Sequence, residues 1–168
     1  MSNYMLSQYL SANGDGTGVT EATMVAGSPE TVLYIEPPTA QDFHIMRMIV
    51  YVEDTGAFDA DKYGNNITLT NGIEVRTVGA HGITADLTAG KPVLTNSHWA
   101  RYCHDIRVDD FGTGNETLSV RWTFEKSGKP IILSGTDNER LEIVLSDDFS
   151  GLVSHLFLVQ GTIDFQPG

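Results

Sequence analysis

The side chains of this chain that are best suited to chemistry are its histidines, which can bind metals or transfer protons. Five occur, at positions 44, 81, 98, 104 and 155. In metal-binding jelly rolls of the cupin kind, the site needs two histidines one residue apart on a strand, a carboxylate and a distant third histidine. No such pair exists, and His98 and His104, six residues apart, do not share a helix face. The spacing favours scattered surface or half-buried imidazoles over a metal centre.

Two acidic segments have the opening pattern of a calcium-binding loop without its end. Asn13, Asp15 and Thr17 follow the EF-hand order, but the twelfth position is Met24, where a bidentate glutamate is required. The acidic segment 59–70 fails in the same way, because it ends on a threonine. Neither segment therefore predicts an EF-hand.

Two pairs of aspartates leave one calcium alternative open. Asp109-Asp110 and Asp147-Asp148 lie in segments that can meet at one end of a β-sandwich, where their carboxylates would hold a calcium ion that stabilises an assembly. The competing interpretation is that they are solvated loop tips whose side chains form Asx turns. We favour the second interpretation and predict no metal or cofactor.

Nucleophilic catalysis has no sequence signature in this chain. There is no Gly-x-Ser-x-Gly motif and no phosphate-binding Gly-x-x-x-x-Gly-Lys-Ser/Thr loop. Cys103 adjoins His104, yet it falls on the apolar face of a predicted helix and is interpreted as a packing thiol. The separation of paired carboxylates, which glycoside hydrolysis depends on, cannot be read from a sequence. We predict no catalytic residues and classify the chain as a non-enzyme.

The composition is that of a folded, acidic, single domain. The 168 residues include 40% hydrophobic and 19% charged residues, with a net charge of -12. No basic run exists to bind phosphate backbones, so we expect no nucleic-acid partner. No apolar run reaches membrane-spanning length and the first residues lack a signal-peptide pattern, so we expect no membrane partner and no export. The single cysteine excludes an internal disulfide.

Alternating apolar segments, separated by turn-forming residues, predict about eight or nine strands. Asn71-Gly72 is typical of a two-residue hairpin turn and divides one of the segments. The strongest segment, 43–52, is apolar on both faces, which is typical of a central strand or one covered by a second subunit. Simple alternation places Phe43, Ile45, Ile49 and Tyr51 on one of its faces, opposite Met46, Met48, Val50 and Val52. The predicted strands are 18–26, 31–36, 43–52, 67–78, 118–124, 130–133, 140–146 and 152–163.

The predicted architecture is all-β: a β-sandwich of the jelly-roll or Greek-key type, because the loops differ greatly in length. Residues 1–16 form an N-terminal arm, and residues 17–168 form the single sandwich domain. One short helix is predicted over 95–105, with Trp99, Tyr102 and Cys103 on one face.

Exposed aromatic and apolar residues are the best candidates for binding, since such residues are enriched at the centres of interfaces. The arm contributes two tyrosines and two leucines, and the acidic loop 53–66 carries two aromatic residues. The predicted interface residues are Tyr4, Leu6, Tyr9, Leu10, Phe58 and Tyr63.

A group of short strand-and-turn motifs over residues 40–163 resembles small accessory virion proteins of tailed bacteriophages, and among them the jelly-roll capsid cement or decoration proteins. The motifs are Thr70-Asn71-Gly72-Ile73, Thr95-Asn96, Arg121-Trp122-Thr123-Phe124, and Asp147-Asp148-Phe149-Ser150-Gly151-Leu152 followed by His155 and Val159-Gln160-Gly161.

The resemblance implies a homo-oligomer, often a trimer, that binds the major capsid protein on the outer surface of the head after synthesis in the host cytoplasm. It leaves open a place in the tail, neck or fibre of the same particle. A carbohydrate-binding β-sandwich that uses Trp99 and Trp122 to stack on sugars is an alternative from another class. A metal-dependent jelly-roll enzyme is the least favoured, because its histidine pattern is missing.

Overall fold

The computed structural model describes residues 4–11, 13–14, 31–54, 73–79, 104–110, 116–124, 130–145, 152 and 154–165. Within these ranges all regular structure is β, and no helix of membrane-spanning length occurs. The strands are β1 (Tyr4–Tyr9), β2 (Thr31–Ile35), β3 (Gln41–Asp54), β4 (Ile73–Val78), β5 (His104–Asp110), β6 (Glu116–Thr123), β7 (Ile131–Ser134), β8 (Arg140–Leu145) and β9 (Ser154–Phe165).

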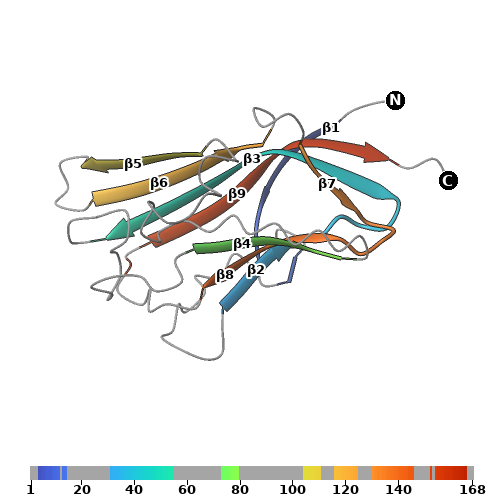
Figure 1. Cartoon of the computed structure of the whole chain (residues 1–168), viewed down its shortest axis with the longest axis horizontal. Coiled ribbons are helices and arrows are strands. Elements are labelled where there is room, and N and C mark those ends of the chain that lie inside the picture. The colour runs from blue at the N-terminus through green and yellow to red at the C-terminus, as the bar shows by residue number, and fades with distance from the viewer. Residues whose placement is uncertain are drawn as a thin grey trace.

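The strands form two curled sheets, one above the other in Figure 1, an arrangement consistent with a β-sandwich. The larger sheet, sheet A, has the order β1-β9-β3-β6-β5, and the smaller, sheet B, has the order β2-β8-β4. β7 belongs to sheet A as well: it pairs with the first part of β3 (Asp42–Ile45), while β6 pairs with the rest (Arg47–Asp54). Every described pairing is antiparallel.

The core lies between the two sheets, where alternate residues of the facing strands meet. Sheet A supplies Leu6, Phe43, Ile45, Met48, Val50, Val52, Leu133, Phe157 and Val159, and sheet B supplies Leu33, Ile35, Leu141, Ile143 and Leu145. Leu10 and Phe124 complete the described cluster.

A β-bulge in β3 changes which residues face the core. The register with β9 shifts between Ile45 and Arg47, so Met46 is the extra residue, and its carbonyl accepts the Phe124 N–H at 2.8 Å. A bulge moves all following side chains to the other face. The prediction that Phe43 and Ile45 lie on a different face from Met48, Val50 and Val52 is therefore wrong. All five are buried together.

The bulge depends on Gly161, the β9 residue opposite Ile45. A Cβ atom at Gly161 would lie 1.9 Å from the carbonyl oxygen of His44, which is backbone and cannot move aside cheaply. Gly135 has a similar place in the turn between β7 and β8, where a Cβ would lie 2.1 Å from the Pro38 carbonyl oxygen. Glycine is required at both positions because the backbones approach so closely.

Most predicted strands within the described residues are confirmed, and the exceptions are at the N-terminus and near residue 104. The prediction for 18–26, the first half of 67–78 and its Asn71-Gly72 turn lie outside the described residues. Residues 4–9 of the predicted arm form β1, an edge strand of sheet A, because they pair with β9 along their whole length. The predicted helix 95–105 also lies outside the described residues, except that its last two positions are the first two of β5.

Candidate functional site

The residues with catalytic chemistry do not converge in the described part of the chain. No group of three or more His, Cys, Asp or Glu side chains has metal-binding geometry there. His44 lies on β3 and His155 on β9, while His104 begins β5. Among the residues singled out in the sequence, the following lie outside the described residues: His81, His98, Cys103, and the Asp147-Asp148 pair of the calcium alternative.

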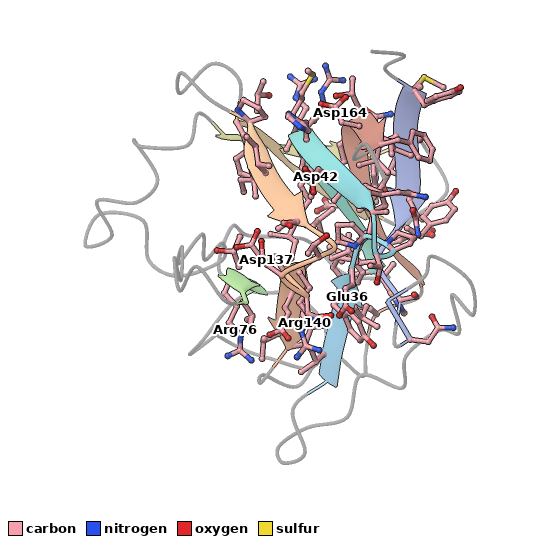
Figure 2. All side chains as sticks on the ribbon, turned by 90° about the vertical axis from the view of Figure 1, so that its right-hand side faces the viewer. Glu36, Asp42, Arg76, Asp137, Arg140 and Asp164 are labelled. Atoms are coloured by element: carbon pink, nitrogen blue, oxygen red, sulfur yellow. The ribbon has the colours of Figure 1, made fainter. Side chains whose placement is uncertain are left out.

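His44 is paired with a carboxylate on the outer face of sheet A. Its Nε2 lies 3.1 Å from Oδ2 of Asp164, with both side chains about one-third exposed or less. Asp42 is opposite Asp164 in the ladder between β3 and β9, and the two aspartates lie close together in Figure 2. The two carboxylates are like charges placed opposite each other, and the one on Asp164 has the His44 imidazole within hydrogen-bonding distance. We interpret the cluster as part of the sheet's own stabilisation.

The outer face of sheet B contains a second charged cluster, centred on a buried glutamate. The Glu142 side chain is 1% exposed. Arg76 Nε lies 2.7 Å from its Oε2, and Arg140 Nη2 lies 2.5 Å from its Oε1. The guanidinium of Arg140 also lies 4.8 Å from the centre of the Tyr34 ring, a cation–π arrangement. Figure 2 shows both arginines on the smaller sheet, apart from Asp42 and Asp164.

This cluster explains why an acid is tolerated on the strand β8, which is buried on both faces. Two cations satisfy both carboxylate oxygens, and a buried charge needs such pairing to be stable. Each carboxylate oxygen of Glu142 is thus paired with an arginine. We interpret it as structural.

The outer face of sheet A has a different character, because apolar side chains cross it from strand to strand. Tyr9, Leu158 and Ile49 lie opposite one another across β1, β9 and β3, and Leu156 lies opposite Tyr51 in the next row. We call these five residues the outer band. Tyr9 is 42% and Tyr51 is 44% exposed, while the other three are half-buried.

The outer band faces away from the core, as its neighbours in the chain show. Val50 and Val52 flank Tyr51 and are at most 2% exposed, and Phe157 lies between Leu156 and Leu158 at 3%. Alternate side chains of a strand point to opposite faces. The band is therefore a contiguous apolar surface that sheet B cannot cover.

The edge of sheet A next to the outer band is the strand β1. The N–H of Leu10 donates to the Phe157 carbonyl at 3.0 Å, which makes them a hydrogen-bonded pair of the antiparallel ladder. Such pairs alternate along a ladder. The backbone groups of Met5, Ser7 and Tyr9 therefore point away from β9, toward the outer edge.

Within the described part of the chain, this edge is open over those three residues. No described residue forms a backbone hydrogen bond with Met5, Ser7 or Tyr9 on the side away from β9. Met5 is the most exposed large apolar side chain in the described part of the chain, at 84%. The opening ends at Ser11, which exchanges two backbone hydrogen bonds with Tyr34 of β2.

A groove lies beside β1. It has a volume of about 370 Å³ and is lined by Met5, Leu6, Ser7, Met46, Arg47, Thr123, Gln160 and Gly161. The lining includes Met46, the extra residue of the bulge, together with residues of β1, β6 and β9. A second open cleft of about 410 Å³ lies at the end of the sandwich, between β1, β2 and the start of β3. The groove is the one that adjoins the open edge.

The predicted interface residues have three outcomes. Tyr9 belongs to the outer band, and Tyr4 is 55% exposed, with its ring edge-on to Phe165 at 5.2 Å between centroids. Leu6 and Leu10 are 2% exposed and pack in the core, so the chain itself covers them. Phe58 and Tyr63 lie outside the described residues.

Sequence reasoning missed most of the candidate surface. Met5, Ile49, Tyr51, Leu156 and Leu158 were not among the predicted interface residues, yet all lie on the outer face or edge of sheet A. One signal was present in the sequence: the segments around them are apolar on both faces of their strands. A strand of this kind has more apolar surface than one core can bury.

Comparison of the chain with protein-family models, with curated proteins and with solved structures finds no match.

Proposed function

We propose that this chain is a non-enzymatic structural protein of a virion, a cement or decoration protein of the jelly-roll type that binds the outer surface of a phage head as a homo-oligomer. The outer band is the observation that carries the proposal. The motifs that resemble capsid decoration proteins supply the virion setting. In this proposal the major capsid protein is the partner.

The outer band has the properties that a protein-binding surface requires. Removing apolar surface from water contributes about 25 cal/mol per Å², before the costs of association. Tyrosine is favoured at interface centres because it combines a large apolar ring with a polar tip, and the band includes Tyr9 and Tyr51. The net charge of -12 keeps such a protein away from the genome and soluble at high concentration.

The test is reconstitution on phage heads that lack the protein. The unaltered chain is expected to co-sediment with the heads and to raise their resistance to heat. The double variant Tyr9→Ser, Tyr51→Ser is expected to fold normally and to bind at least about tenfold more weakly, because it loses two aromatic contacts. Val78→Ser, which removes a 39% exposed apolar residue from sheet B, is the matched control and is expected to bind normally.

The copy number per virion gives a second test. Hundreds of copies per particle would support a cement protein, whereas a small ring of copies found with the tail or neck would place the protein elsewhere in the virion and reject the proposal. Equal binding by the unaltered chain and the double tyrosine variant removes the role of the outer band. Binding to a glycan array, with no binding to heads, favours the carbohydrate-binding alternative.

A further inference from the structure

The open edge of β1 has no charged residue over its six positions, although the chain as a whole is strongly acidic. Exposed edge strands of soluble proteins are normally protected by charge, proline or a covering segment, because unpaired backbone groups attract other strands. At Met5, Ser7 and Tyr9 the described residues provide none of these. An unprotected edge in a folded protein is a place for strand addition.

We propose that β1 pairs with β1 of a second copy of this chain, antiparallel and about a two-fold axis at Ser7, so that the two copies of sheet A form one continuous sheet. The pairing deepens the homo-oligomer of the proposed function by naming its contact. It is a property of the isolated protein and can be tested without any phage component.

The two-fold register follows from the backbone directions. In a pairing centred on Ser7, Ser7 lies opposite Ser7 of the second copy and Met5 lies opposite Tyr9. These are the residues whose N–H and C=O groups point to the open edge, so each pair can exchange both N–H···O bonds. A two-fold contact requires a surface that is complementary to itself, and this register provides it.

The side chains of the pairing are complementary as well. Residues directly opposite in a ladder share a face, so Tyr9 of the second copy faces Met5 on the outer side of sheet A. That position adjoins the groove of about 370 Å³ beside the bulge. Sulfur–aromatic contact between Met and Tyr is favourable. The symmetry repeats this contact on the other side of the axis.

The absence of charge on β1 allows a second copy of this acidic chain to approach the edge. Two acidic chains repel each other over their whole surfaces, yet no like charges face each other at the pairing itself. Salt should therefore strengthen the dimer by screening the remote repulsion. A contact held by ion pairs has the opposite dependence. The pairing is short compared with a standard interface, so we expect dissociation constants in the micromolar range.

The first experiment measures the mass of the purified, full-length chain against concentration by analytical ultracentrifugation. We expect a reversible monomer–dimer equilibrium that moves toward dimer as salt is added. Ser7→Pro is expected to remain folded and become monomeric, because it removes an N–H that points to the open edge and that the ladder with β9 does not use.

The second experiment tests the symmetry directly. Ser7→Lys and Ser7→Glu each place like charges opposite each other at the axis, and each is expected to dimerise about fivefold more weakly than the unaltered chain. Mixing the two variants is expected to restore a dimer of one Lys chain with one Glu chain. Val78→Lys, which adds the same charge on sheet B, is the control and should dimerise normally.

Several results overturn the proposal. A chain that stays monomeric at high concentration has no such contact, and a trimer, which the resemblance implies, is incompatible with a single two-fold pair. If the Lys and Glu variants each dimerise as strongly as the unaltered chain, the contact lies elsewhere. Head binding is measured independently. A Ser7 variant that is monomeric in solution but binds heads as well as the unaltered chain supports the contact and rejects binding as a homo-oligomer, whereas a dimer that does not bind heads rejects only the proposed function.

Discussion

The two sheets differ most at their outer faces. On sheet B, Glu142 is clamped between Arg76 and Arg140, and the central strand is buried on both sides. On sheet A, the outer band keeps Tyr9 and Tyr51 exposed, at 42% and 44%. One face is satisfied by interactions within the chain, while the other has apolar surface without a partner in the described residues. The contrast indicates which side of the molecule is available for association.

The strand edges show the same contrast. β2 is covered by the segment after β1, through the two hydrogen bonds between Ser11 and Tyr34 and a third from Glu36 N–H to the Gly14 carbonyl. β5, the far edge of sheet A, has the sequence HDIRVDD, whose charges discourage strand addition. Among the described residues, β1 has neither form of protection. Of these three edges, the one beside the outer band is open.

The largest expected effect on stability is at the charged cluster of sheet B. The double variant Arg76→Met, Arg140→Met leaves the buried Glu142 carboxylate without a cation, and we expect the free energy of unfolding to fall by about 3–5 kcal/mol. Glu142→Leu should cost less, because both arginines are partly exposed and can be hydrated. Urea denaturation measures both changes. If Glu142→Leu lowers the free energy of unfolding more than the double arginine variant does, compensation of a buried charge is not the main role of the cluster.

A smaller effect is expected at the bulge, which decides the faces of β3. Gly161→Ala places a Cβ against the His44 carbonyl, and we expect a loss of about 2 kcal/mol in the free energy of unfolding. Gln160→Ala, one residue away on the outer face, is the control and should change stability by less than about 0.5 kcal/mol. Equal effects at the two positions would contradict the requirement for glycine.

The strands of the core could be predicted from the sequence because each lies in an apolar segment bounded by turn-forming residues. The segments that contain β2, β3, β4, β6, β7, β8 and β9 were all predicted to be strands. β1 could not be distinguished from an arm, since a six-residue segment is stabilised by its partner, and that partner lies at the opposite end of the chain. The bulge was not predicted because strict alternation of side chains along a strand does not allow for an inserted residue.

The candidate surface could be predicted only in part. Tyr9 was identified from its residue type, while Leu6 and Leu10, of equally suitable type, are in the core. Assigning them needs the register of β1 against β9. Likewise, Arg76 and Glu142 are 66 residues apart in sequence, so nothing local indicates that they meet. Long-range pairing in an all-β chain decides which apolar residues remain outside.

The smallest effect on stability is expected in the outer band itself, and it gives the sharpest comparison of the two faces of one strand. Tyr51 and Val50 are neighbours on β3, but Tyr51 is 44% exposed while Val50 is 0% exposed. Tyr51→Ser should change the free energy of unfolding by only about 0.5 kcal/mol, since a surface substitution removes little burial. Val50→Ala should cost about 1–2 kcal/mol through a core cavity.

Binding should show the reverse order. Tyr51→Ser is expected to weaken association with heads, whereas Val50→Ala should leave it nearly unchanged as long as the protein remains folded. Denaturation and co-sedimentation on the same two variants therefore separate the face that holds the protein together from the face that holds a partner. A Tyr51→Ser protein that is strongly destabilised would mean that the outer band is already covered within the chain, and the proposed surface would be lost with it.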